Sequence, residues 1–183
     1  MSYKWWLLLA SCLFGIGLVL GLASPTTIGG LLDEDATVLE ELAGFLTALP
    51  QSSVLVIILV KNVSALLISF AFSPIFCLVP VMALTFNGWF LGLVTTPVIQ
   101  EQSLGYLLAG LLPHGILELP AFIIGEAAAL SFGSAVLLAL FKKERRNLLA
   151  PSFRQNLKYL TVALALLLPA AIIETYITPL LLG

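Results

Sequence analysis

The residues of this chain that could bind or transfer something gather around its single histidine. His114 lies in an otherwise apolar run, residues 111–120, and Glu118 follows four positions later. Residues four apart share one face of an α-helix, and Glu126, a further eight positions along, falls roughly on that face. Such a line of imidazole and carboxylate groups could bind a cation, relay protons or recognise a polar group of a partner. His114 and Glu118 are also candidate metal ligands, although their spacing matches no established metal motif.

The same run also has a purely structural interpretation. It is interrupted by Pro113, Gly115 and Pro120. Proline lacks the backbone N–H that a helix interior needs, so we expect a break at residues 113–115. Backbone groups at a break inside a membrane must find partners, and the histidine could serve only to tie this break to Glu174 near the C-terminus. The residues alone leave both interpretations open.

The composition indicates an integral membrane protein. The 183 residues are 60% hydrophobic and 10% charged, with a mean hydropathy of +1.11. Soluble domains carry roughly 25% charged residues. The apolar runs do not alternate with polar residues, as barrel strands would, so we expect an all-α polytopic bundle forming a single transmembrane domain over residues 1–183. The net charge of −2 gives no sign of a nucleic-acid partner.

Five apolar runs are long enough for membrane spans: residues 5–22, 51–70, 75–95, 104–141 and 159–178. Residues 24–50 form a polar connector, in which apolar spacing over 37–49 predicts a short amphipathic helix. Residues 142–158 form a basic loop with six Lys and Arg residues against Glu144 alone.

Positive charge in short loops faces the cytoplasm, which places the basic loop there together with Lys4. The basic loop and Lys4 can both be cytoplasmic only if an even number of crossings separates them. This is the case if residues 104–141 cross the membrane once. We therefore predict five full transmembrane helices, with residues 104–115 as a re-entrant or surface-lying half-helix that ends at the break. The N-terminus is then inside and the C-terminus outside. Six helices with the N-terminus outside is the alternative, and it violates only the position of Lys4.

Further polar residues lie inside the predicted spans: Lys61, Asn62, Asn87 and Glu174. A charge at mid-bilayer is costly and should find a partner within the bundle. Counting about 20 residues per crossing from the basic loop places Glu174, His114 and Glu118 near the outer boundary. The same count puts Glu126 slightly deeper and Asn87 in the outer half.

Four pieces of the chain resemble the stage II sporulation protein M family. They are Pro113, His114 and Gly115 with Glu118 and Pro120; Asn62; Asn87 and Gly88 before Gly92; and the run from Glu174 to Pro179. The resemblance extends over nearly the whole chain in the same order. It implies a multi-pass protein of the cytoplasmic membrane of a bacterium or archaeon. It also implies a scaffold role, because the namesake members belong to a complex that remodels peptidoglycan during spore engulfment and hold hydrolases there.

Two functions follow as hypotheses. The first is a non-enzymatic scaffold that binds protein partners through its outer face. The second is a small transporter or channel, expected to be a homo-oligomer, whose polar cluster in the outer half lines a path. An enzyme is not expected, since there is one histidine and neither His-Glu-x-x-His nor Gly-x-Ser-x-Gly, and no cofactor is expected. Membrane lipid is an expected partner in either case. A cavity joining Lys61 or Asn62 to His114 would favour transport, and a dry bundle would favour the scaffold.

Overall fold

The structure is a computed structural model that describes residues 2–24 and 49–182. Five of its helices are long and apolar enough to cross a membrane. They are α1 (Tyr3–Ala23), α4 (Gln51–Phe72), α5 (Leu78–Glu101), α6 (Leu104–Phe141) and α7 (Leu149–Tyr176). A 3-10 helix, η2 (Lys143–Leu148), joins α6 to α7, and the short α8 (Thr178–Leu182) follows α7. The predicted all-α polytopic bundle with five spanning helices is confirmed, whereas the amphipathic helix predicted over 37–49 lies almost wholly outside the described residues.

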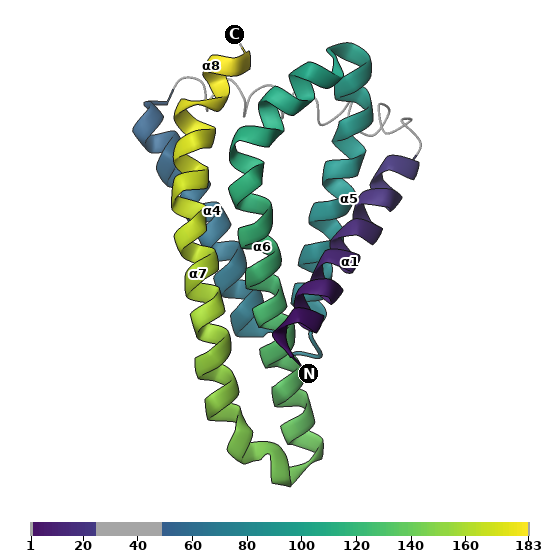
Figure 1. Cartoon of the computed structure of the whole chain (residues 1–183), viewed down its shortest axis with the longest axis vertical. Helices are drawn as coiled ribbons and strands as arrows, with labels where there is room; N and C mark the ends of the chain where they lie inside the picture. The colour runs from purple at the N-terminus through teal and green to yellow at the C-terminus, as the bar shows by residue number, and fades with distance from the viewer. Residues whose placement is uncertain (1, 25–48, 183) are drawn as a thin grey trace.

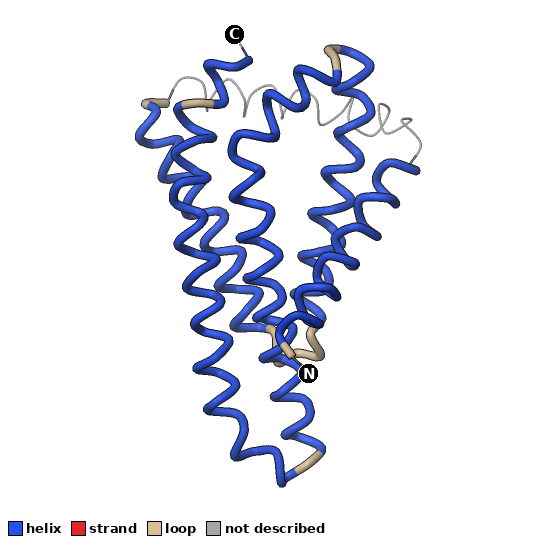
Figure 2. Tube along the Cα trace, in the orientation of Figure 1, coloured by secondary structure: helices blue, strands red, loops and turns tan. Residues whose placement is uncertain are grey.

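The long helices run alternately up and down, so the two termini lie at opposite ends of the molecule (Figure 1). The turn between α6 and α7, which carries the basic residues, lies toward the same end as the N-terminus. α1 packs along α5, and α6 packs along α7. α6 is the common element, because it also contacts α1, α4 and α5. Toward the C-terminal end of the molecule, α1 and α5 diverge from α6 and α7 (Figure 2).

Close approach of α1 and α5 depends on glycine. An added Cβ atom would overlap backbone atoms of the facing helix at four positions: Gly17, Gly21, Gly88 and Gly92. Each helix thus presents a pair of glycines four residues apart, the spacing that lets two membrane helices pack backbone to backbone. Gly88 and Gly92 of α5 thus act in packing against α1.

The rest of the bundle is held by two apolar clusters that share α6. One joins α6 to α4 and α7 and includes Leu66, Leu160 and Leu167. The other joins α6 to α1 and α5 and includes Ala10, Leu84 and Leu130. α6 can take part in both because most of its residues from 125 to 133 are small and buried. Its glycines in this stretch face Leu66 and the turn after α4, so this small-residue face packs within the chain.

α6 differs from the predicted broken segment. It is one helix of 38 residues, and Pro113, Gly115 and Pro120 lie inside it. Residues 104–115 are therefore not a separate half-helix but its first turns, which cross obliquely at the C-terminal end of the bundle before the helix turns downward (Figure 1). Proline removes one hydrogen bond and bends a helix, and neighbouring helices in a membrane compensate for the loss.

Two predicted connectors are also helical. α5 continues through Pro97 to Glu101, so the link to α6 is only residues 102–103. The predicted basic loop, residues 142–158, consists of η2 and the first turns of α7. Arg154 and Lys158 are exposed there, while Asn156 is buried. The charged residues lie on the exposed face of an amphipathic helix, so the abundance of charge over residues 142–158 did not indicate a loop.

Candidate functional site: a polar cavity inside the bundle

A cavity of about 320 Å³ lies between α5 and the group formed by α4, α6 and α7. Its polar lining comes from all four helices: Lys61 and Asn62 of α4, Asn87 of α5, His114 and Glu118 of α6, and Glu174 of α7. Much of the remaining lining is apolar and includes Phe14 and Phe122. The structure thus brings together six of the seven polar residues that the sequence singled out.

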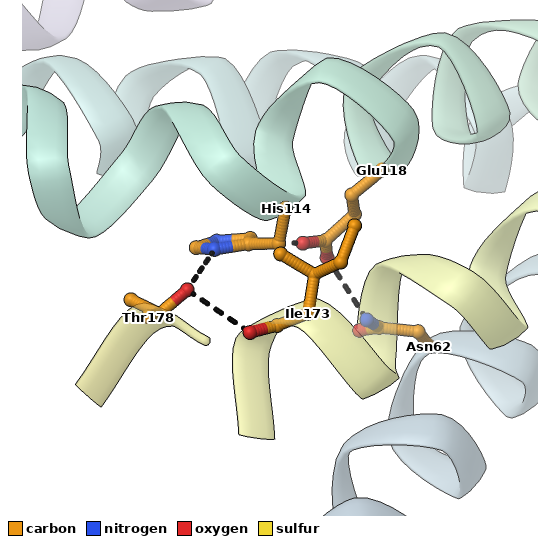
Figure 3. A network of polar contacts seen from close by, with 5 residues as sticks. All are labelled: Asn62, His114, Glu118, Ile173 and Thr178. Atoms are coloured by element: carbon orange, nitrogen blue, oxygen red, sulfur yellow. Dashed lines mark hydrogen bonds and ion pairs between the residues drawn. The ribbon is translucent and has the colours of Figure 1, made fainter. Parts of the chain in front are cut away.

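His114 is held in one orientation by the end of α7 and the start of α8 (Figure 3). Its Nδ1 atom lies 3.3 Å from Thr178 Oγ1, and that hydroxyl donates to the carbonyl oxygen of Ile173 at 3.4 Å. A hydroxyl has one hydrogen to donate, so when Thr178 donates to Ile173 it accepts from the imidazole, and we assign the proton to Nδ1 on this ground. In neutral His114 the lone pair is then on Nε2, the nitrogen that faces Glu118.

Glu118 is fixed from two sides. One carboxylate oxygen, Oε1, accepts a hydrogen bond of 2.9 Å from Asn62 Nδ2 on α4. The other oxygen, Oε2, lies 3.8 Å from His114 Nε2, one turn earlier on α6. This separation is too long for a direct hydrogen bond. A carboxylate and an imidazole lone pair repel each other at this distance unless positive charge lies between them.

Glu174 completes a cluster of three ligand groups. One atom each from His114, Glu118 and Glu174 can be chosen so that all lie within 4.8 Å of one another. All three residues are partly buried. One imidazole nitrogen and two carboxylate oxygens from two helices are a donor set that divalent transition metals accept.

Two further residues of the lining make no direct bond to this cluster. Lys61 is exposed, and the ion pairs among the described residues do not include it. Asn87 is also exposed, and its side chain donates to the carbonyl oxygen of Ala83 in its own helix at 2.8 Å. The hydrogen-bond partner expected for Asn87 is therefore its own backbone.

The position of the cluster along the bundle can be given relative to the start of α1. Tyr3 donates a hydrogen bond of 2.7 Å to the carbonyl oxygen of Ile124, and its ring stacks on Tyr159. Ile124 is therefore level with the start of α1. His114 lies ten residues further along α6, about 15 Å at 1.5 Å per residue. On the other side, α6 and α7 extend beyond the start of α1 (Figure 1).

Glu126 faces α4, as Glu118 does, but it lies too far along α6 to be part of the cluster. It is 0% exposed, and its Oε2 atom accepts a hydrogen bond from Ser69 near the end of α4. Its Oε1 atom has no hydrogen-bond partner among the described residues. Eight residues are slightly more than two helical turns, so Glu126 is about 12 Å from Glu118 along the axis and on the side that faces α4.

The sequence reasoning did not single out Thr178 or Ser69. Each is a hydroxyl residue at an apolar site, and each bonds one of the predicted polar side chains. Thr178 lies in the run that carries the family resemblance, but that run gave it no role, and Ser69 is marked only as a polar residue within an apolar run. Many such residues bond their own helix instead. Thr85, Thr95 and Thr161 do so here.

The fold and this cavity define a polytopic helical membrane protein with a polar, partly open site between its helices. The family described as Stage II sporulation protein M matches residues 7–179, and the chain belongs to this family. The chain is also similar to the uncharacterized protein MJ0793 of Methanocaldococcus jannaschii, with 28% identity over 174 residues that cover 94% of this chain and 93% of the relative. No solved structure matches the chain.

Proposed function

We propose that this protein binds a divalent transition-metal cation in the cavity and carries it across the membrane. The observation that carries the proposal is the orientation of His114. Its Nδ1 atom is within hydrogen-bond distance of Thr178, and its Nε2 atom, which carries the lone pair in the tautomer assigned above, faces a carboxylate oxygen 3.8 Å away. Histidines that ligate metals characteristically donate the other ring N–H to a neighbouring acceptor, which fixes the tautomer and the ring.

The distances suit a small ion. Bonds from Zn²⁺ to nitrogen and to carboxylate oxygen are about 2.0–2.2 Å, so one ion can contact two atoms that lie up to about 4.2 Å apart. The 3.8 Å between His114 Nε2 and Glu118 Oε2 falls within this limit. The three ligand atoms of the set that includes Glu174 lie within 4.8 Å of one another. The Glu174 carboxylate would therefore have to move toward the ion by less than about 1 Å on binding. A carboxylate on a flexible stem can do this by rotation.

The charges of the cavity favour a cation. With Glu118 and Glu174 ionised, Lys61 protonated and His114 neutral, the lining would carry one uncompensated negative charge inside a spanning segment, where charge is costly. A bound cation removes this cost. Lys61 is exposed and has a long side chain, so its ammonium group can move away as the cation enters.

The cavity also bears on the choice between transport and a scaffold. It joins Asn62 to His114 in one space at mid-bundle, the feature that favours transport over a dry bundle. α6 contains Pro113 and Pro120 close to the residues that line this space, and its path is bent (Figure 1). Binding sites of transporters are commonly built beside irregular helices at the bilayer midplane. No comparable feature favours the scaffold, which stays a prediction, as does the homo-oligomer.

Flux into proteoliposomes tests the proposal. Purified protein is reconstituted in vesicles loaded with a Zn²⁺-sensitive dye, and uptake is compared between the wild type, Glu118→Gln and the control Glu101→Gln. Glu101 is exposed at the end of α5 and outside the cavity. We expect Glu118→Gln to reduce uptake at least about tenfold and the control to leave it unchanged. Uptake no faster than in vesicles without protein would refute transport.

A further inference from the structure

A second cavity, also about 320 Å³, lies at the basic end of the molecule. It is enclosed by the start of α1, the last turns of α6, η2 and the first turns of α7. Its lining includes Tyr3, Trp6, Ser134, Leu138, Arg145 and Gln155. None of its lining residues belongs to the cavity that holds His114, so the two sites are independent.

The charge around this cavity is strongly positive. Residues 142–158 contain six Lys and Arg residues and one acidic residue. Arg145 is the member of this group that lines the cavity. It is exposed, and the ion pairs found within residues 2–24 and 49–182 do not include it. Its planar guanidinium group therefore has donors available for an anion, and its geometry suits two phosphate oxygens at once.

Neutral hydrogen-bond donors accompany the arginine. The hydroxyl groups of Ser131, Ser134 and Ser152 and the amide of Gln155 contribute to the same lining. A phosphate group offers several acceptor oxygens, so a guanidinium group beside hydroxyl and amide donors matches it chemically.

The remaining lining is apolar or aromatic and lies at the level expected for the membrane surface. Tyr3 and Trp6 belong to the first turns of α1, next to Lys4 and Trp5, a grouping typical of the interface. Leu138 and Leu148 line the cavity and are 43% and 55% exposed. A ligand with a phosphate group and an apolar body would contact both parts of this lining. A free phosphate ion would contact only the polar part.

We infer that this cavity binds the phosphate headgroup of an anionic membrane lipid from the cytoplasmic leaflet. Arg145 contacts the phosphate, while Trp6 and Leu138 contact the glycerol and acyl region. Basic pockets between membrane helices on the cytoplasmic side are suited to such headgroups. The lipid would then connect the start of α1 to the α6–α7 hairpin, two parts of the chain that both line the cavity.

Native mass spectrometry of the full chain in neutral detergent tests this inference. The probes are phosphatidylglycerol, zwitterionic phosphatidylcholine and inorganic phosphate. The variants are Arg145→Gln, the charge-conserving Arg145→Lys and the control Arg154→Gln. Arg154 belongs to the same basic segment, is exposed and does not line the cavity. Arg145→Gln and Arg154→Gln remove the same charge, so general attraction of anions to the basic segment affects both equally.

We expect the wild type to bind phosphatidylglycerol in preference to phosphatidylcholine. Arg145→Gln should weaken that binding about tenfold or more, since a hydrogen bond to a charged group is lost. Arg145→Lys should be intermediate, and Arg154→Gln should bind as the wild type does. Equal weakening by both glutamine variants would overturn the inference, because the site would then be general surface charge. Displacement of the lipid by inorganic phosphate at equal concentration would also overturn it, because the site would then take the free ion.

Discussion

Gly17 is the position where one added methyl group should loosen the bundle most clearly. It lies on α1, where a Cβ atom would overlap the carbonyl group of Thr85 and approach the backbone nitrogen of Trp89. These are backbone atoms of α5 and cannot rotate aside. In Gly17→Ala, α1 and α5 must therefore move apart, and the neighbouring contact of Gly21 with α5 is loosened with them.

The expected magnitude follows from two opposing effects. Forcing an extra methyl group into a packed interior costs about 1–3 kcal/mol. Replacing glycine by alanine inside a helix gains about 0.5–1 kcal/mol. Gly15 provides the control, since a Cβ atom built there meets nothing within 4 Å and only the gain applies. Gly15→Ala and Gly17→Ala should therefore differ by roughly 1–3 kcal/mol in unfolding free energy, with Gly17→Ala the less stable.

Unfolding in mixed micelles, driven by increasing sodium dodecyl sulfate and followed by circular dichroism, measures this difference. Both variants change one glycine of the same helix to alanine, so effects on helix propensity cancel in the comparison. If Gly17→Ala were as stable as Gly15→Ala, the close packing of α1 on α5 described above would be wrong.

Three further predictions concern single contacts. Asn62→Leu leaves one oxygen of Glu118 without its donor and should weaken Zn²⁺ binding about tenfold or more in equilibrium titration, whereas Asn62→Gln should restore part of it. Thr178→Val removes the acceptor of the His114 ring and should weaken the same binding about tenfold, while Thr178→Ser should bind as the wild type; equal binding by all three would contradict the tautomer assigned here. Tyr3→Phe keeps the stacked ring and loses one hydrogen bond, so unfolding should become easier by about 1 kcal/mol, and no change would show that this bond contributes nothing.

The number of spans could be predicted from the sequence because hydropathy and charge act over whole segments. Runs of about 20 apolar residues identify membrane helices, and the basic residues after residue 141 identify one end of the bundle. Both signals depend on many residues, so the exact ends of helices do not affect them. The count of residues from the basic loop also predicted that His114, Glu118 and Glu174 lie at one level, and these three side chains do lie close together.

The path of α6 could not be predicted from its residue types. Pro113 and Pro120 would each weaken a helix in water, but inside a bundle the lost hydrogen bonds are compensated by neighbours. The depth of Glu126 could not be predicted either, because the count started from the basic residues. The hydrogen bond from Tyr3 to Ile124 shows that α6 extends well beyond the start of α1.

The second cavity had no signal in the sequence. Its lining combines Tyr3 and Trp6 with Arg145 and Gln155, residues more than 130 positions apart. These residues lie close together only because of the way α1 packs against the α6–α7 hairpin, and hydropathy does not determine that packing. Thr178 was missed for a related reason, since its role depends on the turn that directs α8 toward His114.

Titration of the purified protein with Zn²⁺ tests the central claim most directly, because it asks whether His114 and the two carboxylates form one site. Isothermal calorimetry in a neutral detergent would compare the wild type with His114→Ala and with Glu101→Gln. We predict saturable binding of one ion per chain in the wild type and in Glu101→Gln, weakened at least about tenfold in His114→Ala. Binding that His114→Ala leaves unchanged, or no saturable binding by the wild type, would contradict the account.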